Sequence, residues 1–124
     1  MIILDSCVLI ALTDEANTFH SDAERILTTT ESLAITALTG AEVMVDSASR
    51  PQVRWRDLLF DLDIDVIDIT ESNMEAIAEM RRRSGLKMPD AIVLWVAEAH
   101  GAGVASFDQQ LLNRAHQLGI RTVT

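Results

Sequence analysis

The feature that most constrains the fold is a set of very short, almost wholly apolar segments spread along the chain. Residues 2–4, 33–35 and 104–106 predict strands, because they are short and apolar on successive positions. Strands of this kind are buried on both faces, as in a parallel sheet covered by helices on its two sides. Two more strands are expected at 120–123 and at 62–69, where aspartates alternate with apolar residues at first.

Apolar residues recur at helical spacing in the segments between these strands. Because strands and helices alternate in the order β-α-α-β-α-α-β-α-α-β-α-β, we expect the α/β class, a three-layer α/β/α sandwich with a mostly parallel central sheet of four or five strands. The helices are expected over 8–12, over 18–29, from Thr36 or Thr39 to Ala48, from Pro51 through Leu62, over 71–83, over 89–100 and over 111–118.

The bulk properties predict one small domain over residues 1–124. A single cysteine excludes an internal disulfide framework and fits a reducing compartment. The apolar start of the chain has no basic region before it, carries Asp5 within it, and is too short to cross a bilayer. We therefore expect a cytoplasmic protein with no membrane partner.

Four acidic residues lie where an apolar segment passes into a loop or a helix: Asp5, Glu42, Asp90 and Asp108. In a parallel sheet, functional groups gather beyond the carboxyl ends of the strands, so one edge can collect all four. Two carboxylates about 4 Å apart repel by roughly 4 kcal/mol at an effective dielectric near 20. Such a cluster takes up protons or binds a hard divalent cation such as Mg²⁺ or Mn²⁺, and a metal site of this kind suggests hydrolysis.

Each of the four acids also has a purely structural interpretation. Asp5 and Asp108 could cap the helices that follow them. Thr39-x-x-Glu42 has the spacing of a capping box. Asp90, which follows a proline, is favoured at a helix N-terminus by the helix dipole alone. Each structural explanation is plausible for one residue, but four separate explanations are needed to account for all four acids. A single functional cluster accounts for them together.

Other candidate sites are weaker. Asp61-x-Asp63-x-Asp65 imitates the start of a calcium loop but lacks its glycine and its closing glutamate, so we interpret it as a solvated strand face. No histidine has the spacing of a zinc ligand. Cys7 is expected to be a small packing residue. Trp55 fits either the core or a dimer interface.

Four short motifs together resemble those of PIN-domain nucleases. The segment at 1–10 reads MIILDSCVLI, the segment at 39–43 reads TGAEV, the segment at 89–97 reads PDAIVLWVA, and the segment at 106–108 reads SFD. Their order, their spacing and the compact length of the chain resemble the VapC-type toxins of bacterial toxin–antitoxin pairs. A serine stands at 106 where threonine is more common in that family.

The resemblance implies an endoribonuclease that hydrolyses RNA phosphodiesters with Mg²⁺ or Mn²⁺. It implies Asp5, Glu42, Asp90 and Asp108 as the acidic cluster, with Ser6 and Ser106 as secondary members. It also implies a homodimer and a small antitoxin that blocks the site. We expect Asp5 and Asp108 to bind the metal directly, while Glu42 and Asp90 hold metal-bound waters or orient the attacking water.

The net charge of −9 argues against a nucleic-acid partner, because phosphate binding is driven by cationic patches. A bound cation would offset part of that charge locally. Basic residues are also clustered, so contacts with an RNA backbone are expected from Arg81, Arg82, Arg83 and Lys87. An alternative is a catalytically silent PIN-like module that binds RNA or a partner. A phosphatase is disfavoured, since Asp5-Ser6-Cys7 lacks the second acid of an Asp-x-Asp motif.

Overall fold

The computed structural model describes residues 1–46 and 52–123, and its strands form one parallel sheet. The strand order is β3-β2-β1-β4-β5, so the first strand lies in the middle. All four neighbouring pairs are parallel, and Ile3 of the central strand is opposite both Ala34 and Val104. The strands are β1 (Ile2–Leu4), β2 (Leu33–Thr36), β3 (Ile64–Ile67), β4 (Gly103–Ala105) and β5 (Thr122–Val123).

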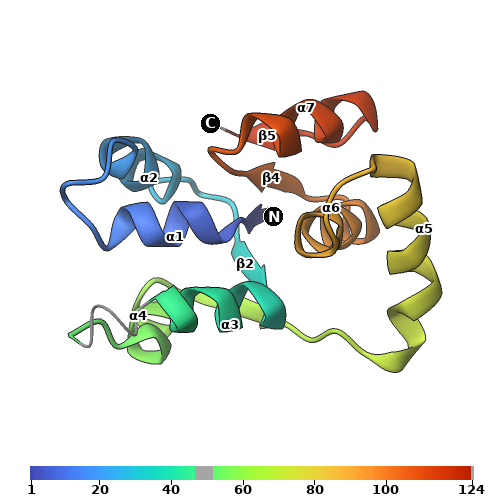
Figure 1. The fold of residues 1–124 in the computed structure, drawn as a ribbon. Coiled ribbons are helices and arrows are strands. Elements are labelled where there is room, and N and C mark those ends of the chain that lie inside the picture. The colour runs from blue at the N-terminus through green and yellow to red at the C-terminus, as the bar shows by residue number, and fades with distance from the viewer. Residues whose placement is uncertain (47–51, 124) are drawn as a thin grey trace.

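Helices cover both faces of this sheet, which confirms the expected three-layer α/β/α sandwich. Figure 1 shows α1 and α2 on one side of the strands and α5 and α6 on the other. The order of strands and α-helices also agrees with the sequence-based expectation. The helices are α1 (Ser6–Leu12), α2 (His20–Ile26), α3 (Ala37–Asp46), α4 (Trp55–Asp61), α5 (Met74–Ser84), α6 (Met88–His100) and α7 (Gln109–Gln117), and a 3₁₀ turn, η2 (Glu71–Asn73), precedes α5.

The core consists of two layers because successive strand residues point to opposite faces of the sheet. In β1, Ile2 and Leu4 join the cluster formed with α1 to α4, whereas Ile3 joins the cluster formed with α5 to α7. In β2, Ala34 likewise lies on the opposite side from its neighbours. The short apolar segments are therefore buried on both faces, as their sequence predicts.

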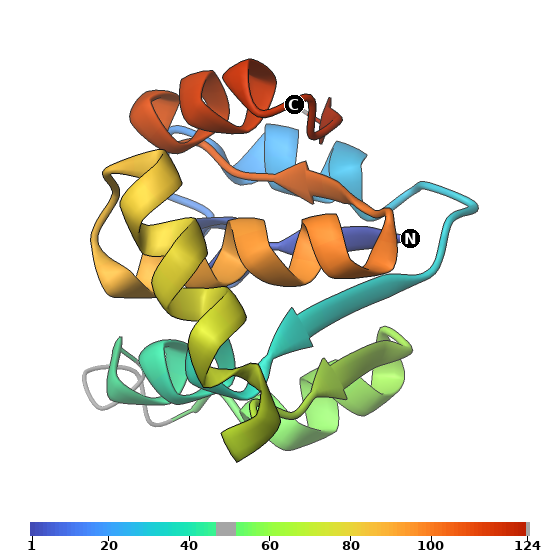
Figure 2. The ribbon, with the colours of Figure 1, turned by 90° about the vertical axis from the view of Figure 1, so that its right-hand side faces the viewer.

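The helix α6 is the most deeply buried helix of the second layer. Six of its residues are buried, and the helix packs between the sheet and α5 (Figure 2). Trp55, at the start of α4, is 4% exposed and packs in the opposite core layer, so the structure places it in the core. No helix within residues 1–46 and 52–123 is long and apolar enough to cross a membrane.

Several element boundaries differ from the expected ones for local reasons. The helix expected over 18–29 ends at Ile26, and the Thr28 hydroxyl then donates to the Arg25 carbonyl at 2.6 Å. The strand expected from residue 62 begins at Ile64, because Asp63 has a left-handed backbone with φ of 54° that breaks the extended run. The expected positions of Ala48 and Pro51 lie outside the described residues.

The start of α3 depends on a buried threonine pair. Thr36 ends β2, and its Oγ1 accepts a hydrogen bond from the backbone N–H of Thr39 at 3.1 Å. Its hydroxyl donates to Thr39 Oγ1 at 3.3 Å, and both threonines are buried. This pair caps α3 directly after the strand, and α3 carries Glu42.

Replacing Thr36 with valine tests this cap. The substitution keeps the shape but leaves the buried N–H of Thr39 without its acceptor, so the free energy of unfolding should fall by about 1–2 kcal/mol. Urea unfolding of both proteins measures the change. Thr122→Val, at an exposed position of the edge strand β5, is the matched control and should change it by less than about 0.5 kcal/mol. Equal losses in the two variants would contradict the assigned role of Thr36.

Candidate active site

Asp5 lies directly after β1, at the carboxyl edge of the sheet. Its backbone N–H donates to the Ala105 carbonyl at 2.9 Å, which extends the pairing of β1 with β4 by one residue. Its carboxylate Oδ1 accepts from the backbone N–H of Ser6 at 2.8 Å and caps α1. Its Oδ2 accepts from the Ser106 hydroxyl at 2.7 Å. The side chain is buried and held in one orientation by both of its oxygens.

Ser106 connects Asp5 to Asp108. It follows β4 rather than ending it, and its side chain is wholly buried. While its hydroxyl donates to Asp5, its Oγ accepts from the backbone N–H of Asp108 at 3.0 Å. Asp108 caps α7, since its Oδ1 accepts from the backbone N–H groups of Gln110 and Leu111 at 2.9 and 3.3 Å. Structural capping by Asp5 and Asp108 is therefore confirmed, and it coexists with their position at the same edge.

Glu42 does not take part in the capping box that its sequence suggests. The helix α3 begins at Ala37, so Thr39 lies inside its first turn and Thr36 is the capping residue. The capping-box interpretation of Glu42 is wrong for this reason. Glu42 is half-buried in the second turn, and its pKa is raised by that burial and by the charges of Asp5 and Asp90.

Asp90 occupies the first turn of α6, directly after Pro89. It is half-buried, and its pKa is raised by burial and then by the charges of Asp5 and Asp108, while Lys87 acts in the opposite direction. A helix N-terminus favours a negative charge.

The charge effects on these two pKa values link all four acids. Asp5 acts on both Glu42 and Asp90, and Asp90 is also influenced by Asp108. Segments far apart in the sequence bring them together, because the parallel strands place the starts of α1, α3, α6 and α7 at one edge of the sheet.

The chemistry of this cluster suits a divalent cation. All the donors are carboxylate oxygens, and their mutual repulsion would be relieved by a positive charge between them. In the part of the chain that the structure describes, no three acidic, histidine or cysteine side chains are grouped closely enough to bind one ion as they stand. Mg²⁺ needs only one or two direct carboxylates and keeps several waters, so the donor set still fits it.

The secondary residues differ in how they relate to the cluster. Ser6 is half-buried at the start of α1, and its backbone N–H holds Asp5. Lys87 is exposed and close enough to Asp90 to lower its pKa. Two of the arginines are in exposed ion pairs, Arg82 with Glu79 at 2.7 Å and Arg83 with Glu98 at 2.9 Å. Arg81 is exposed on the same helix.

Cys7 is a member of the site that the sequence did not identify as such. Its Sγ lies 3.4 Å from Asp5 Oδ2 and 3.4 Å from Ser106 Oγ, and it accepts from the backbone N–H of Phe107 at 3.3 Å. It also packs against the core, as expected. The sequence signal that could have identified Cys7 as part of the site is its position two residues after Asp5, in the first turn of α1.

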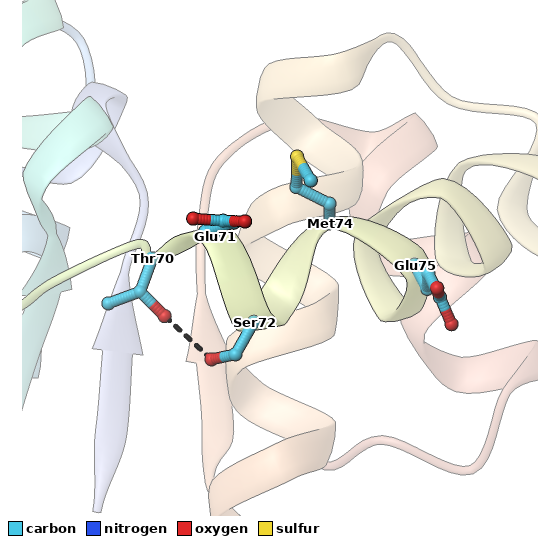
Figure 3. Close-up of a pocket in the computed structure, with 5 residues that line it drawn as sticks. All are labelled: Thr70, Glu71, Ser72, Met74 and Glu75. Carbon is cyan, nitrogen blue, oxygen red and sulfur yellow. Dashed lines mark hydrogen bonds between the residues drawn. The ribbon is translucent and has the colours of Figure 1, made fainter.

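Two other polar regions lie apart from this cluster. Asp61, Asp63 and Asp65 are exposed, as expected, but only Asp65 lies on a strand, since Asp61 ends α4 and Asp63 lies in the turn before β3. A shallow hollow at η2 is lined by Thr70, Glu71, Ser72, Met74 and Glu75, all from one short stretch (Figure 3). Its Thr70 and Ser72 hydroxyls bond at 2.8 Å, and none of the four acids contributes to it.

The charge of Glu42 should make the protein less stable at neutral pH. Because the folded state raises the pKa of Glu42, stability is greatest below the unfolded value and falls as the pH rises through the folded one. Glu42→Gln should therefore raise the free energy of unfolding at pH 7, without divalent metal, by on the order of 0.5–1 kcal/mol after solvent screening. Chemical unfolding at pH 7 and at about pH 4 measures this, and the gain should shrink at the lower pH.

The exposed loop residue Glu15 supplies a control for this experiment. Glu15→Gln should leave the free energy of unfolding nearly unchanged at both pH values. A Glu42→Gln protein that is less stable than the parent at pH 7 would show that the carboxylate is stabilised by its surroundings, contrary to the assigned cause.

The thiol of Cys7 should react slowly in the folded protein. Burial, and to a smaller extent the charge of Asp5, raises the pKa of this thiol from 9.0 to about 11. At pH 8 the thiolate is therefore roughly a hundredfold less populated in the folded protein than in the unfolded chain. Alkylation by iodoacetamide should therefore be at least about tenfold slower than in the urea-unfolded chain, because the higher nucleophilicity of a high-pKa thiolate offsets part of the loss of thiolate. Mass spectrometry of timed samples measures both rates, and similar rates would contradict this environment of the thiol.

The comparisons with known proteins agree with this architecture. The chain is similar to a toxin–antitoxin complex from Klebsiella pneumoniae, with 25% identity and a TM-score of 0.78 over 100% of this chain and 97% of that chain. The Mycobacterium tuberculosis toxin VapC20, described as cleaving the sarcin–ricin loop, is 18% identical, with a TM-score of 0.76 over 91% of this chain and 94% of that one. FitAcB from Neisseria gonorrhoeae is 18% identical, with a TM-score of 0.71 over 100% and 97%.

No curated protein matches the chain. The sequence itself is matched by the family model of the PIN domain over residues 2–117, which is nearly its whole length. Strands β1 to β4 and the four carboxyl-edge acids lie within this matched region. The chain therefore belongs to the PIN domain family.

Proposed function

We propose that this chain is an endoribonuclease that requires Mg²⁺ or Mn²⁺ and serves as the toxin of a toxin–antitoxin pair. The observation that carries the proposal is that Asp5, Glu42, Asp90 and Asp108 lie on the elements that follow the strands at one edge of a PIN-domain sheet, where the charges of Asp5, Asp90 and Asp108 help raise the pKa of Glu42 or Asp90. The similarity to a toxin–antitoxin complex and to an RNA-cleaving toxin supports it.

In this proposal the four acids hold the metal, with Asp5 and Asp108 as the candidates for direct contact. A bound divalent ion supplies positive charge to the phosphate oxygens and makes a nearby water more acidic. Ser106 fixes the orientation of Asp5 through its hydroxyl. Glu42 and Asp90, whose pKa values are raised, accept a proton more readily than ordinary carboxylates, which suits them to orient the attacking water.

The basic residues near this edge are the proposed contacts with the RNA backbone. Lys87 is the best placed of them, since it already influences Asp90. The ion pairs of Arg82 and Arg83 are exposed, and exposed pairs contribute only about 0–1 kcal/mol. Arg82 and the exposed Arg81 could therefore turn to phosphate oxygens at little cost, whereas Arg83 holds Glu98 through two bonds of 2.9 and 3.0 Å and would exchange its partner at a higher cost.

The proposed protein partners are a small antitoxin and a second copy of this chain. Large apolar side chains are exposed around α3, α4 and β3, where Val45 is 77% exposed and Phe60 is 85% exposed. Exposed apolar groups of this kind commonly mark an association surface, which supports the homodimer. We further propose that the chain is a single domain over residues 1–124 and acts in the cytoplasm.

The proposal is tested by incubating the protein with RNA in the presence of Mg²⁺ or Mn²⁺. Cleavage should occur with metal, cease with EDTA, and fall at least about a hundredfold in Asp90→Asn, because that substitution removes one charge from the cluster. Gel analysis of labelled RNA measures the rate. Glu15→Gln, on an exposed loop, should cleave like the parent. Metal-independent cleavage that survives in Asp90→Asn would remove the proposal.

Two further measurements distinguish this function from the silent binding module. Millimolar Mn²⁺ should raise the melting temperature of a metal-binding protein, since saturation at a hundred times Kd contributes about 2.7 kcal/mol. No shift would favour the silent module. Expression of the intact gene alone should arrest growth, whereas the Asp5→Ala form should not. Equal toxicity of the two forms would count against the toxin assignment.

A further inference from the structure

A second hollow adjoins the acidic cluster on the side of α2. It lies between α2 and the segment that joins β4 to α7, and its lining includes Phe19, Phe107, Arg25 and Gln109. Ser106 also lines it, and the same residue holds Asp5 and the backbone of Asp108. A group in this hollow would therefore sit beside the candidate active site.

One wall of the hollow is a stacked pair of aromatic rings. The ring centroids of Phe19 and Phe107 are 4.5 Å apart, and the ring planes differ by only 7°. Phe107 also packs against the core, but Phe19 is 42% exposed and is absent from both core clusters of the described residues. A large apolar ring that is nearly half exposed beside a polar site offers a surface on which a further flat ring can stack.

The polar groups of the hollow favour a neutral, flat ligand over a free phosphate. Arg25 pairs with Asp22 at 2.9 Å, and Asp22 also lines the hollow, so the local charges offset each other. The guanidinium still has further N–H donors, and the Gln109 amide has a carbonyl oxygen that can accept. Donors and acceptors around an aromatic wall match the edge and the face of a nucleobase.

We propose that this hollow binds a nucleobase of single-stranded RNA next to the scissile phosphate, with the base stacked on the Phe19–Phe107 pair. The inference rests on the proposed ribonuclease function and adds to it a subsite for the substrate. Single-stranded bases are commonly bound by stacking on aromatic side chains, with their edges read by polar groups. Ser106 is buried between this hollow and Asp5, so the subsite and the acids lie on either side of one residue.

The test measures binding rather than cleavage, in the full-length Asp90→Asn background. The probe is a ten-nucleotide single-stranded RNA of mixed sequence that contains 2-aminopurine, whose fluorescence is quenched by stacking. Phe19→Leu keeps the apolar bulk but removes the aromatic face, so we expect the quenching to be lost and Kd to rise about tenfold. Phe19→Trp should restore both. Met74→Leu, at an exposed apolar position at the start of α5 that does not line this hollow, should behave like the parent.

The outcomes separate this subsite from a structural role and from the proposed function itself. If Phe19 only ties α2 to the β4–α7 segment, Phe19→Leu will lower the melting temperature while quenching and Kd stay as in the parent, and the proposal is overturned. Equal affinity of all variants would equally overturn it and leave the hollow to a protein partner. If the parent protein, with Asp90 intact, showed no metal-dependent cleavage of RNA, the ribonuclease would be refuted, yet Phe19-dependent quenching could still be observed in the binding test. The two failures are therefore distinguishable.

Discussion

The site depends on the pairing of β1 with β4 in the middle of the parallel sheet. This pairing brings Asp5 next to the segment after β4, and the Ser106 hydroxyl then closes the contact with a bond of 2.7 Å across 101 residues of chain. The same Oγ holds the backbone of Asp108, and Cys7 supplies a further contact between the two segments. A small buried network thus sets the relative positions of two acids, and the helices that follow them are capped by those same acids.

Gathering carboxylates at one edge has an energetic cost that the rest of the fold must offset. The raised pKa values of Glu42 and Asp90 are the signature of that cost, since both burial and neighbouring charge disfavour their ionised forms. The offset comes from a core that covers both faces of the sheet, with the central strand wholly buried. Ionisable groups that lower the stability of the folded protein are typical of functional sites.

Much of this architecture could be predicted because it depends on local patterns. Short apolar runs predict strands buried on both faces, and their alternation with helical stripes predicts a parallel sheet, as the structure confirms. Boundaries were predicted less well, because single residues decide them. Asp63 adopts a left-handed conformation that delays β3, and of the two threonines left open as the start of α3, Thr36 is the one that caps it. Because α3 begins at Ala37, the Thr39-x-x-Glu42 pattern does not lie at the start of the helix, and Glu42 forms no capping box.

The sequence by itself determined the fold class, the order of elements and the four acids as candidates, because periodicity and the position of an acid after an apolar run are properties of adjacent residues. Only the tertiary structure decided which groups meet. Ser106 and Cys7 contact Asp5, Trp55 lies in the core, and two of the three clustered arginines are in ion pairs. Some of these contacts join residues that are distant along the chain, and others depend on the exact course of a helix. They arise from the order and register of the strands, which no local pattern encodes.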